Sequence, residues 1–105
     1  MLIDKAEINT CFEIAIFKVP EKNKARVIEL SLSIVKEINA EKTVILSHQI
    51  LSKIDNSEEI CWHLTWLNKE AVALIAKKWK SFPSSKELES LVAEKIYYGH
   101  FVSLF

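Results

Sequence analysis

Hydrophobic residues along the chain follow two spacings, one typical of strands and one typical of helices. Residues 11–19 read CFEIAIFKV, and this apolar run stops at Pro20, so it predicts a first strand. Across residues 21–39 the apolar side chains recur every three or four positions, which places them on one face of a long helix. The members of that face are Val27, Leu30, Ile34, Val35 and Ile38, with Ser31 among them.

Residues 43–54 and 59–67 form two further apolar runs, and the polar segment Asp55-Asn56-Ser57-Glu58 separates them. Asp, Asn and Ser favour turns because their side chains bond the local backbone. The short connection therefore predicts a hairpin. Asn68 then stands where a second helix would have its N-cap.

The second helix is expected over residues 69–80, with an inner face that includes Trp79. Ser84 and Glu87 stand three residues apart and predict a capping box for a short further helix. A last strand is expected at residues 95–104. The order strand, helix, strand, strand, helix, strand predicts an α+β, ferredoxin-like βαββαβ sandwich. Its four-stranded antiparallel sheet has the order 4-1-3-2, with two main helices on one face, and residues 1–105 form this single domain.

The hairpin also predicts which side chains share a face. A loop of three or five residues pairs even positions with even positions, which gathers the most apolar set on the face that the helices cover. That set comprises Phe12, Ile14, Ile16, Val44, Leu46, His48, Ile50, Ile60, Trp62, Leu64, Trp66, Tyr98, His100 and Val102.

The odd face is too apolar to be left in water. It carries Ala15, Phe17, Val19, Ile45, Ser47, Gln49, Leu51, Cys61, His63, Thr65, Leu67, Phe101 and Ser103. A single domain of this class has nothing else to cover such a face. We therefore expect a homodimer that packs sheet to sheet.

Composition narrows the classes of partner. The chain has 14 Lys+Arg and 14 Asp+Glu, so its formal net charge of zero argues against a nucleic-acid or anionic-membrane partner. It has no apolar run of about 20 residues and no signal-like N-terminus, which favours the cytoplasm. Cys11 and Cys61 lack metal-type spacing and are expected to be reduced. With Gly99 as the one glycine, a glycine-rich phosphate loop is excluded.

Two groups of residues are candidates for a site. His48, His63 and His100 lie on different predicted strands, so they cannot gather as metal ligands, and no metal or other cofactor is expected. His48 and His100 are the candidate catalytic residues, each with the alternative of a histidine simply satisfied in the sheet. The candidate ligand-binding residues are Trp62, Trp66, Trp79 and Tyr98, which would wall a cavity for a small aromatic ligand or, alternatively, only fill the core.

The chain resembles the dimeric α/β-barrel proteins, the superfamily of the antibiotic-biosynthesis-type monooxygenases. The resemblance covers residues 12–104 and is carried by the element order, by WHLTW at residues 62–66, by WKSFP at residues 79–83 and by GHF at residues 99–101. It implies a homodimer with a ligand cavity between sheet and helices, lined by the Trp that ends strand three, here Trp66.

The resemblance also implies a polar residue on strand one in the oxygenases and haem-degrading members. The chain departs from that pattern if Phe12, Ile14 and Ile16 face the cavity. Three functions are therefore open: a cofactor-independent, monooxygenase-like protein acting on a small aromatic molecule, a non-catalytic binding or regulatory homodimer, and a haem-binding protein that would use His48 or His100. The sequence leaves open whether the chain is an enzyme.

Overall fold

The structure is a computed structural model that describes residues 10–105, and it contains one sheet and three helices within that range. The strands are β1 (Cys11–Lys18), β2 (Ile45–Lys53), β3 (Asn56–Trp66) and β4 (Glu94–Phe101). The helices are α2 (Lys24–Ile38), α3 (Lys69–Lys78) and α4 (Ser85–Leu91). Two 3-10 turns, η1 (Glu21–Asn23) and η2 (Trp79–Ser81), adjoin α2 and α3.

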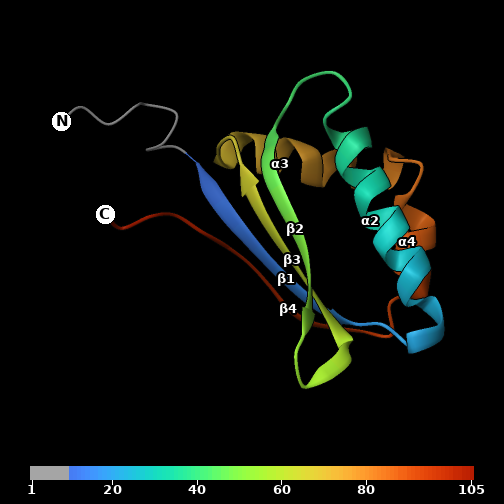
Figure 1. Ribbon diagram of the computed structural model, residues 1–105. Helices are drawn as coiled ribbons and strands as arrows, with labels where there is room; N and C mark the ends of the chain where they lie inside the picture. Colours follow the sequence, from blue (N-terminus) through green and yellow to red (C-terminus); the bar gives the residue numbers. More distant parts are fainter. Residues whose placement is uncertain (1–9) are drawn as a thin grey trace.

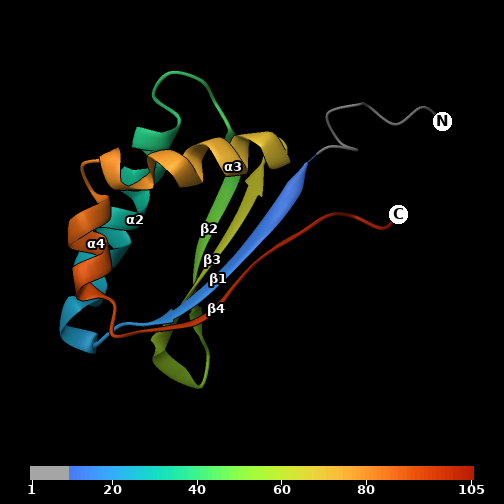
Figure 2. The same cartoon turned by 180° about the vertical axis from the view of Figure 1, so that it is seen from behind.

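The sheet has the order β2-β3-β1-β4, and every neighbouring pair is antiparallel. The predicted order 4-1-3-2 and the ferredoxin-like class are confirmed. All three helices lie on one face of this sheet (Figures 1 and 2). No helix among residues 10–105 is long and apolar enough to cross a membrane.

A side-chain cap marks the start of α3, but within residues 10–105 neither α2 nor α4 has one. Asn68 is the predicted N-cap of α3, and its side-chain oxygen accepts a hydrogen bond of 2.7 Å from the backbone N–H of Ala71. The predicted capping box of α4 is wrong. Ser84 precedes that helix, but its hydroxyl and its backbone N–H both donate to the carboxylate of Glu37 in α2. Glu87 instead pairs with Arg26, so α4 is fixed by contacts with α2.

The strand register corrects the predicted faces of β1. Cys11, Glu13 and Ala15 lie opposite Trp66, Leu64 and Trp62 of β3, and residues directly opposite each other share a face. The odd residues of β1 are therefore the buried ones beneath the helices. The prediction that Phe12, Ile14 and Ile16 face the helices is wrong: alternation places them on the outer face, together with Cys61, His63 and Thr65.

The β2–β3 hairpin confirms the predicted pairing but not the predicted loop. His48 lies opposite Leu64 and Ile50 opposite Trp62, so even positions face even positions. The loop has two residues, 54–55, and a register shift between Ser52 and Lys53 restores the pairing.

A second register shift in β2 corrects two more residues. It falls between Ile45 and Ser47 and turns Ile45 into the core opposite Trp66, while Leu46 is exposed. Ile45 was expected on the outer face and Leu46 under the helices, so both predictions are wrong. A bulge of this kind inserts one extra residue and reverses the alternation beyond it.

The two cysteines are both free thiols. Because β1 and β3 are neighbours, the two thiols could have been close, but the structure places them far apart. Cys61 lies opposite Ile16, five residues along β1 from Cys11, and it points to the opposite face of the sheet. Five residues of strand span roughly 16 Å, so the two thiols cannot meet in this fold.

Candidate functional site

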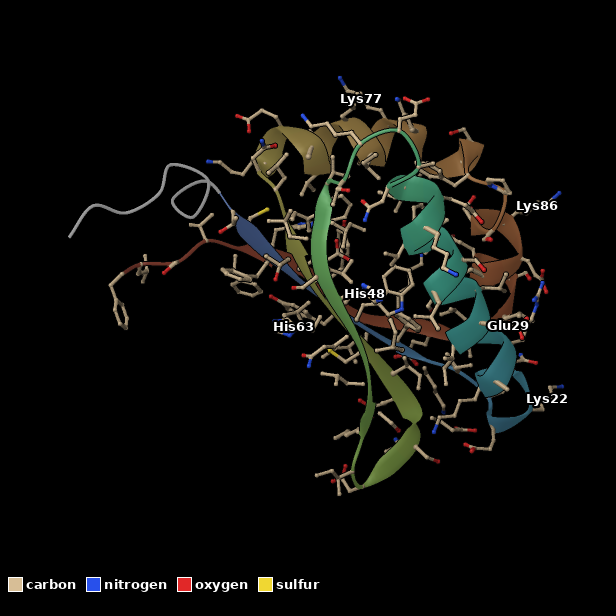
Figure 3. The ribbon with its side chains drawn as sticks, turned by 45° about the horizontal axis from the view of Figure 1, so that its top comes forward. Lys22, Glu29, His48, His63, Lys77 and Lys86 are labelled. Atoms are coloured by element: carbon tan, nitrogen blue, oxygen red, sulfur yellow. The ribbon has the colours of Figure 1, made fainter. Side chains whose placement is uncertain are left out.

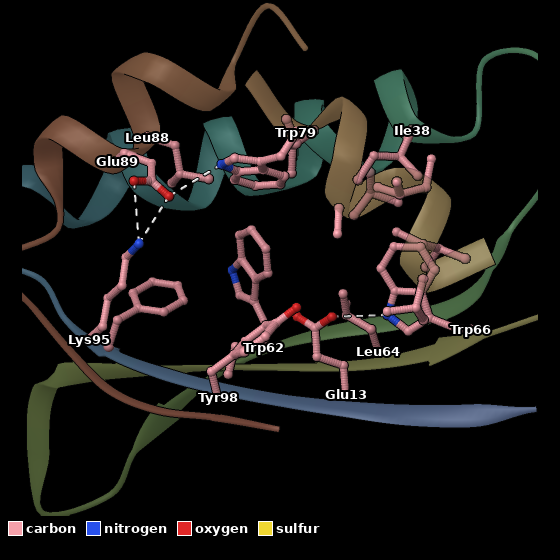
Figure 4. A pocket seen from close by; sticks show the side chains of 18 of the residues that line it. Glu13, Ile38, Trp62, Leu64, Trp66, Trp79, Leu88, Glu89, Lys95 and Tyr98 are labelled. Carbon is pink, nitrogen blue, oxygen red and sulfur yellow. Dashed lines mark hydrogen bonds and ion pairs between the residues drawn. The ribbon is translucent and has the colours of Figure 1, made fainter. Parts of the chain in front are cut away.

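A cavity of about 400 Å³ lies between the sheet and the helices. Strand β3 supplies Trp62, Leu64 and Trp66 to its floor, and the turn η2 brings Trp79 across from above (Figure 4). Isoleucines of α2 and α3 complete the walls: Ile34, Ile38 and Ile75. The volume and the apolar lining are those of a pocket for a small organic molecule.

The aromatic side chains of the cavity are held by one another and by a buried hydroxyl. The ring of Trp62 meets Phe17 edge-on at a centroid distance of 5.5 Å and Trp79 at 6.5 Å. The indole N–H of Trp62 donates to the hydroxyl oxygen of Ser31 at 3.0 Å, and that hydroxyl donates to the carbonyl of Val27. Trp62 is thus a fixed part of the floor, because its one polar atom is already satisfied within the core.

One carboxylate lies in this apolar floor. Glu13 of β1 is only 4% exposed. Its Oε1 accepts a hydrogen bond from Trp66 Nε1 at 3.0 Å and lies 3.0 Å from Nε2 of His100, so three strands meet at this atom. Both of these contacts are made by Oε1 and not by the other oxygen, Oε2. Figure 4 shows it turned away from Trp66, toward the part of the cavity between Trp62 and Tyr98.

The surroundings of Glu13 act on its ionisation in two directions. Burial raises the pKa of the Glu13 carboxyl, and the charge of His100 and the hydrogen bonds from His100 and Trp66 lower it, with burial the larger effect. A carboxylate with a raised pKa is a stronger base than one in water. Glu13 can therefore accept a proton from a weakly acidic group placed against Oε2.

The other end of the cavity is polar and exposed. Glu89 of α4 accepts hydrogen bonds from Trp79 Nε1 at 3.3 Å and from Lys95 Nζ at 3.2 Å (Figure 4). Both charged side chains are about half exposed or more, and they border the cavity opposite the Trp66 end. The cavity thus runs from a buried carboxylate at one end to a solvated ion pair at the other.

The structure brings most of the predicted site residues together. Trp62, Trp66, Trp79 and Tyr98 all line the cavity. His100 does not line it but reaches it through Glu13.

The remaining two histidines lie elsewhere. His48 lies on the edge strand β2 (Figure 3), where it is exposed and does not line the cavity. The polar partner of Trp66 is Glu13. His63 lies on the outer face of the sheet, with Nδ1 3.2 Å from Oε1 of Gln49.

Glu13 is the site residue that the sequence analysis missed. The signal was present, because Glu13 and Lys18 are the only charged residues in the predicted strand 11–19, and Glu13 stands among apolar residues. The predicted pairing placed Phe12, Ile14 and Ile16 under the helices, and Glu13 was named on neither face. Burial of Glu13 requires donors from Trp66 and His100, which lie 53 and 87 residues away in the chain.

Comparison with solved structures shows which known proteins share this fold. No protein-family model and no curated protein matches the chain. Among solved structures, it is similar to a mutant form of SnoaB, a cofactor-independent oxygenase from Streptomyces nogalater, with a TM-score of 0.75 and 14% identity over 92% of this chain and 95% of the other.

Two further structures give the same result. A protein from Caulobacter crescentus, provisionally named an antibiotic biosynthesis monooxygenase, has a TM-score of 0.77 at 11% identity, over 95% of this chain and 94% of the other. A conserved protein from Methanosarcina mazei has a TM-score of 0.74 at 11% identity, over 93% and 96%. Identities this low speak for the fold alone. The chain therefore has the ferredoxin-like fold of the antibiotic-biosynthesis-monooxygenase-like proteins.

Proposed function

We propose that this protein binds a small, flat aromatic molecule in the cavity and that Glu13 takes a proton from a hydroxyl group of that molecule. The chemistry would be cofactor-independent and monooxygenase-like, as the name of SnoaB suggests for a protein of the same fold. The observation that carries the proposal is a buried carboxylate in an aromatic cavity, with Trp66 and His100 both on Oε1 and neither on Oε2. A ligand hydroxyl would donate a hydrogen bond to Oε2.

The aromatic walls support a flat ligand. Trp62, Trp66 and Trp79 offer ring faces and edges to a molecule between sheet and helices. Water would be displaced as such a molecule enters, which strengthens its hydrogen bond with Glu13. Phenolic hydroxyls are weakly acidic, so a carboxylate of raised pKa is a matched base for them.

The reaction that fits this site balances with dioxygen as the oxidant. A hydroquinone and O₂ give a hydroxyquinone and water. One oxygen atom forms a new carbon–oxygen bond in place of a ring carbon–hydrogen bond, and the other leaves as water with two hydrogens from the substrate. Glu13 would take the hydroxyl proton, which leaves an electron-rich phenolate to reduce the oxygen, and would return that proton to the departing water.

Haem binding fits the residues less well. It would need His48 or His100 as an iron ligand within the cavity. His48 is exposed and does not line the cavity, and Nε2 of His100 is directed at Glu13. Neither histidine lines the cavity, so neither is placed to ligate an iron between sheet and helices.

The proposal includes a homodimer. The outer face of the sheet presents partly exposed apolar residues from every strand, among them Ile14, Ile16, Leu51 and Phe101. A second copy of the chain, packed sheet to sheet about a two-fold axis, would remove this face from water. A stable interface buries about 800 Å² on each partner, and burial of apolar surface contributes about 25 cal/mol per Å².

A cytoplasmic location belongs to the same proposal. It is supported by Cys11 and Cys61, which are free and lie on opposite faces of the sheet. Disulfides persist mainly in oxidising compartments, and this fold does not use one.

Oxygen uptake with a hydroquinone tests the proposal. The wild-type protein should consume oxygen above the rate of spontaneous oxidation, and mass spectrometry should find a hydroxyquinone that carries one atom from ¹⁸O₂. Glu13→Gln should bind the hydroquinone within a few fold of wild type but lower kcat by about 100-fold or more. Glu41→Gln, at an exposed loop position, is the matched control and should change nothing.

Two results would count against parts of this proposal. Saturable binding without oxygen uptake would leave a non-catalytic binding protein. The absence of saturable binding would overturn the proposed function as a whole.

A further inference from the structure

His100 is placed so that it touches both the buried carboxylate and solvent. It lies directly opposite Glu13 in the β1–β4 register, and β4 is an edge strand of the sheet. Its Nε2 is 3.0 Å from Oε1 of Glu13, while its side chain is 25% exposed. The ring of Tyr98 meets the imidazole edge-on at a centroid distance of 5.0 Å. The imidazole thus has fixed neighbours on two sides.

We propose that His100 is a positioning residue for the cavity: together with Trp66 it holds Oε1 of Glu13, so that Oε2 stays ionised and turned toward the ligand. This inference rests on the proposed function, because it assigns His100 a role toward the same ligand site. It differs from the role of a catalytic histidine that touches the ligand, since His100 acts through Glu13.

Two physical effects support this role. A carboxylate whose one oxygen is held by two donors loses the freedom to rotate, so its other oxygen is fixed in direction. A buried carboxylate also tends to take up a proton unless a donor or a positive charge is near it. His100 supplies the donor from one side and Trp66 supplies it from the other. Trp66 carries no charge, so His100 is the partner that can respond to protonation.

The other titratable groups near Glu13 do not supply a positive charge to its carboxylate. Tyr98 lies beside His100 on β4, and the charge of Glu13 contributes to the raised pKa of its hydroxyl after burial. Cys11 on β1 has its pKa raised by burial and then by Glu13, and it also feels Lys69 and Glu70 of α3. Tyr98 and Cys11 are neutral when protonated. Among the groups that act directly on the Glu13 carboxyl, His100 is the cationic one when protonated.

The experiment measures the ionisation of Glu13 itself. Infrared difference spectra follow the carboxylic acid and carboxylate bands as the pH is raised, and Glu13→Gln identifies the bands that belong to Glu13. In His100→Leu the midpoint should move upward by about one pH unit or more. In His100→Gln, whose amide N–H can still donate to Oε1, the midpoint should return part of the way. His63→Leu, on the outer face, is the control and should leave it unchanged.

The pH dependence of oxygen uptake gives the second readout. The acid limb of kcat/KM should move upward in His100→Leu by the same amount as the infrared midpoint, and His100→Gln should restore part of the shift. An unchanged infrared midpoint in a folded His100→Leu protein would overturn the inference. A shifted midpoint in a protein whose wild type neither binds nor oxidises the hydroquinone would uphold this role for His100 toward Glu13 and refute the proposed function alone.

Discussion

Replacement of Trp66 by Phe removes the indole N–H that holds Oε1 of Glu13 and leaves the rest of the core in place. Trp66 is 4% exposed and donates to Glu13 over 3.0 Å. Loss of a hydrogen bond to a charged group costs about 1.5–3 kcal/mol, because the buried carboxylate keeps its desolvation penalty. The smaller ring adds a packing loss of about 1 kcal/mol. We expect Trp66→Phe to lower the free energy of unfolding by about 3 kcal/mol in total.

Urea denaturation followed by circular dichroism measures this loss, with Trp79→Phe as the matched control. The indole N–H of Trp79 donates to the exposed Glu89 over 3.3 Å, so its removal should cost about 1 kcal/mol or less. Thermal unfolding should show the same order, with the Tm of Trp66→Phe lowered by about 10 °C or more. If Trp66→Phe were no more destabilising than Trp79→Phe, the hydrogen bond to a buried, ionised Glu13 would not contribute as argued.

The remaining predictions concern the ionisation of Glu13, the outer face and the thiols. Burial raises the pKa of Glu13 in the folded protein above the ordinary value of 4.5 that it has in the unfolded chain. Between the unfolded and the folded pKa, the folded protein therefore binds more protons than the unfolded chain. The free energy of unfolding should therefore fall as pH rises through that window, and the fall should be smaller in Glu13→Gln. Urea denaturation at a series of pH values measures this, and an equal pH dependence of the free energy of unfolding in the two proteins would contradict it. Ile14→Lys, on the outer face, should convert a dimer to a folded monomer in light scattering, whereas Phe17→Lys should unfold the protein because Phe17 packs against Trp62 beneath the helices. A monomeric wild type at micromolar concentration would refute the dimer. The Tm should be the same with and without reductant, and a large drop on reduction would reveal a disulfide that this fold does not hold.

The order of the elements could be predicted because each follows from local signals. The helical spacing of α2, the N-cap at Asn68 and the polar turn after β2 are each contained within a few residues. Once these elements are known, short connections and the right-handedness of crossovers restrict the sheet order to very few arrangements. The four predicted ligand-binding residues also line the cavity. Trp62 and Trp66 lie on the buried face of β3, Trp79 lies in η2 above it, and Tyr98 lies on β4.

The face of β1 could not be predicted, because both of its alternating sets are apolar. The set with Glu13 is less apolar than the set with Ile14, so hydrophobicity alone selects the wrong face. Glu13 can be buried on this face because Trp66 and His100 contact its carboxylate, and these contacts form only after three strands have assembled. The bulge beside Ile45 is a similar case, since nothing in the local sequence marks the extra residue.

The affinity of the cavity for a hydroxyl group tests the central claim most directly. Calorimetry would compare 2-naphthol with its methyl ether, which has the same rings but no donor. We expect wild type to bind the naphthol at least about 10-fold more tightly than the ether, since the ether cannot donate to Oε2 of Glu13. In Glu13→Gln the amide N–H₂ can occupy the position of Oε2 and donate to either ligand, so the preference should disappear. Equal affinities of wild type for the two molecules, or the same preference in Glu13→Gln, would contradict the claim that Glu13 receives a ligand hydroxyl.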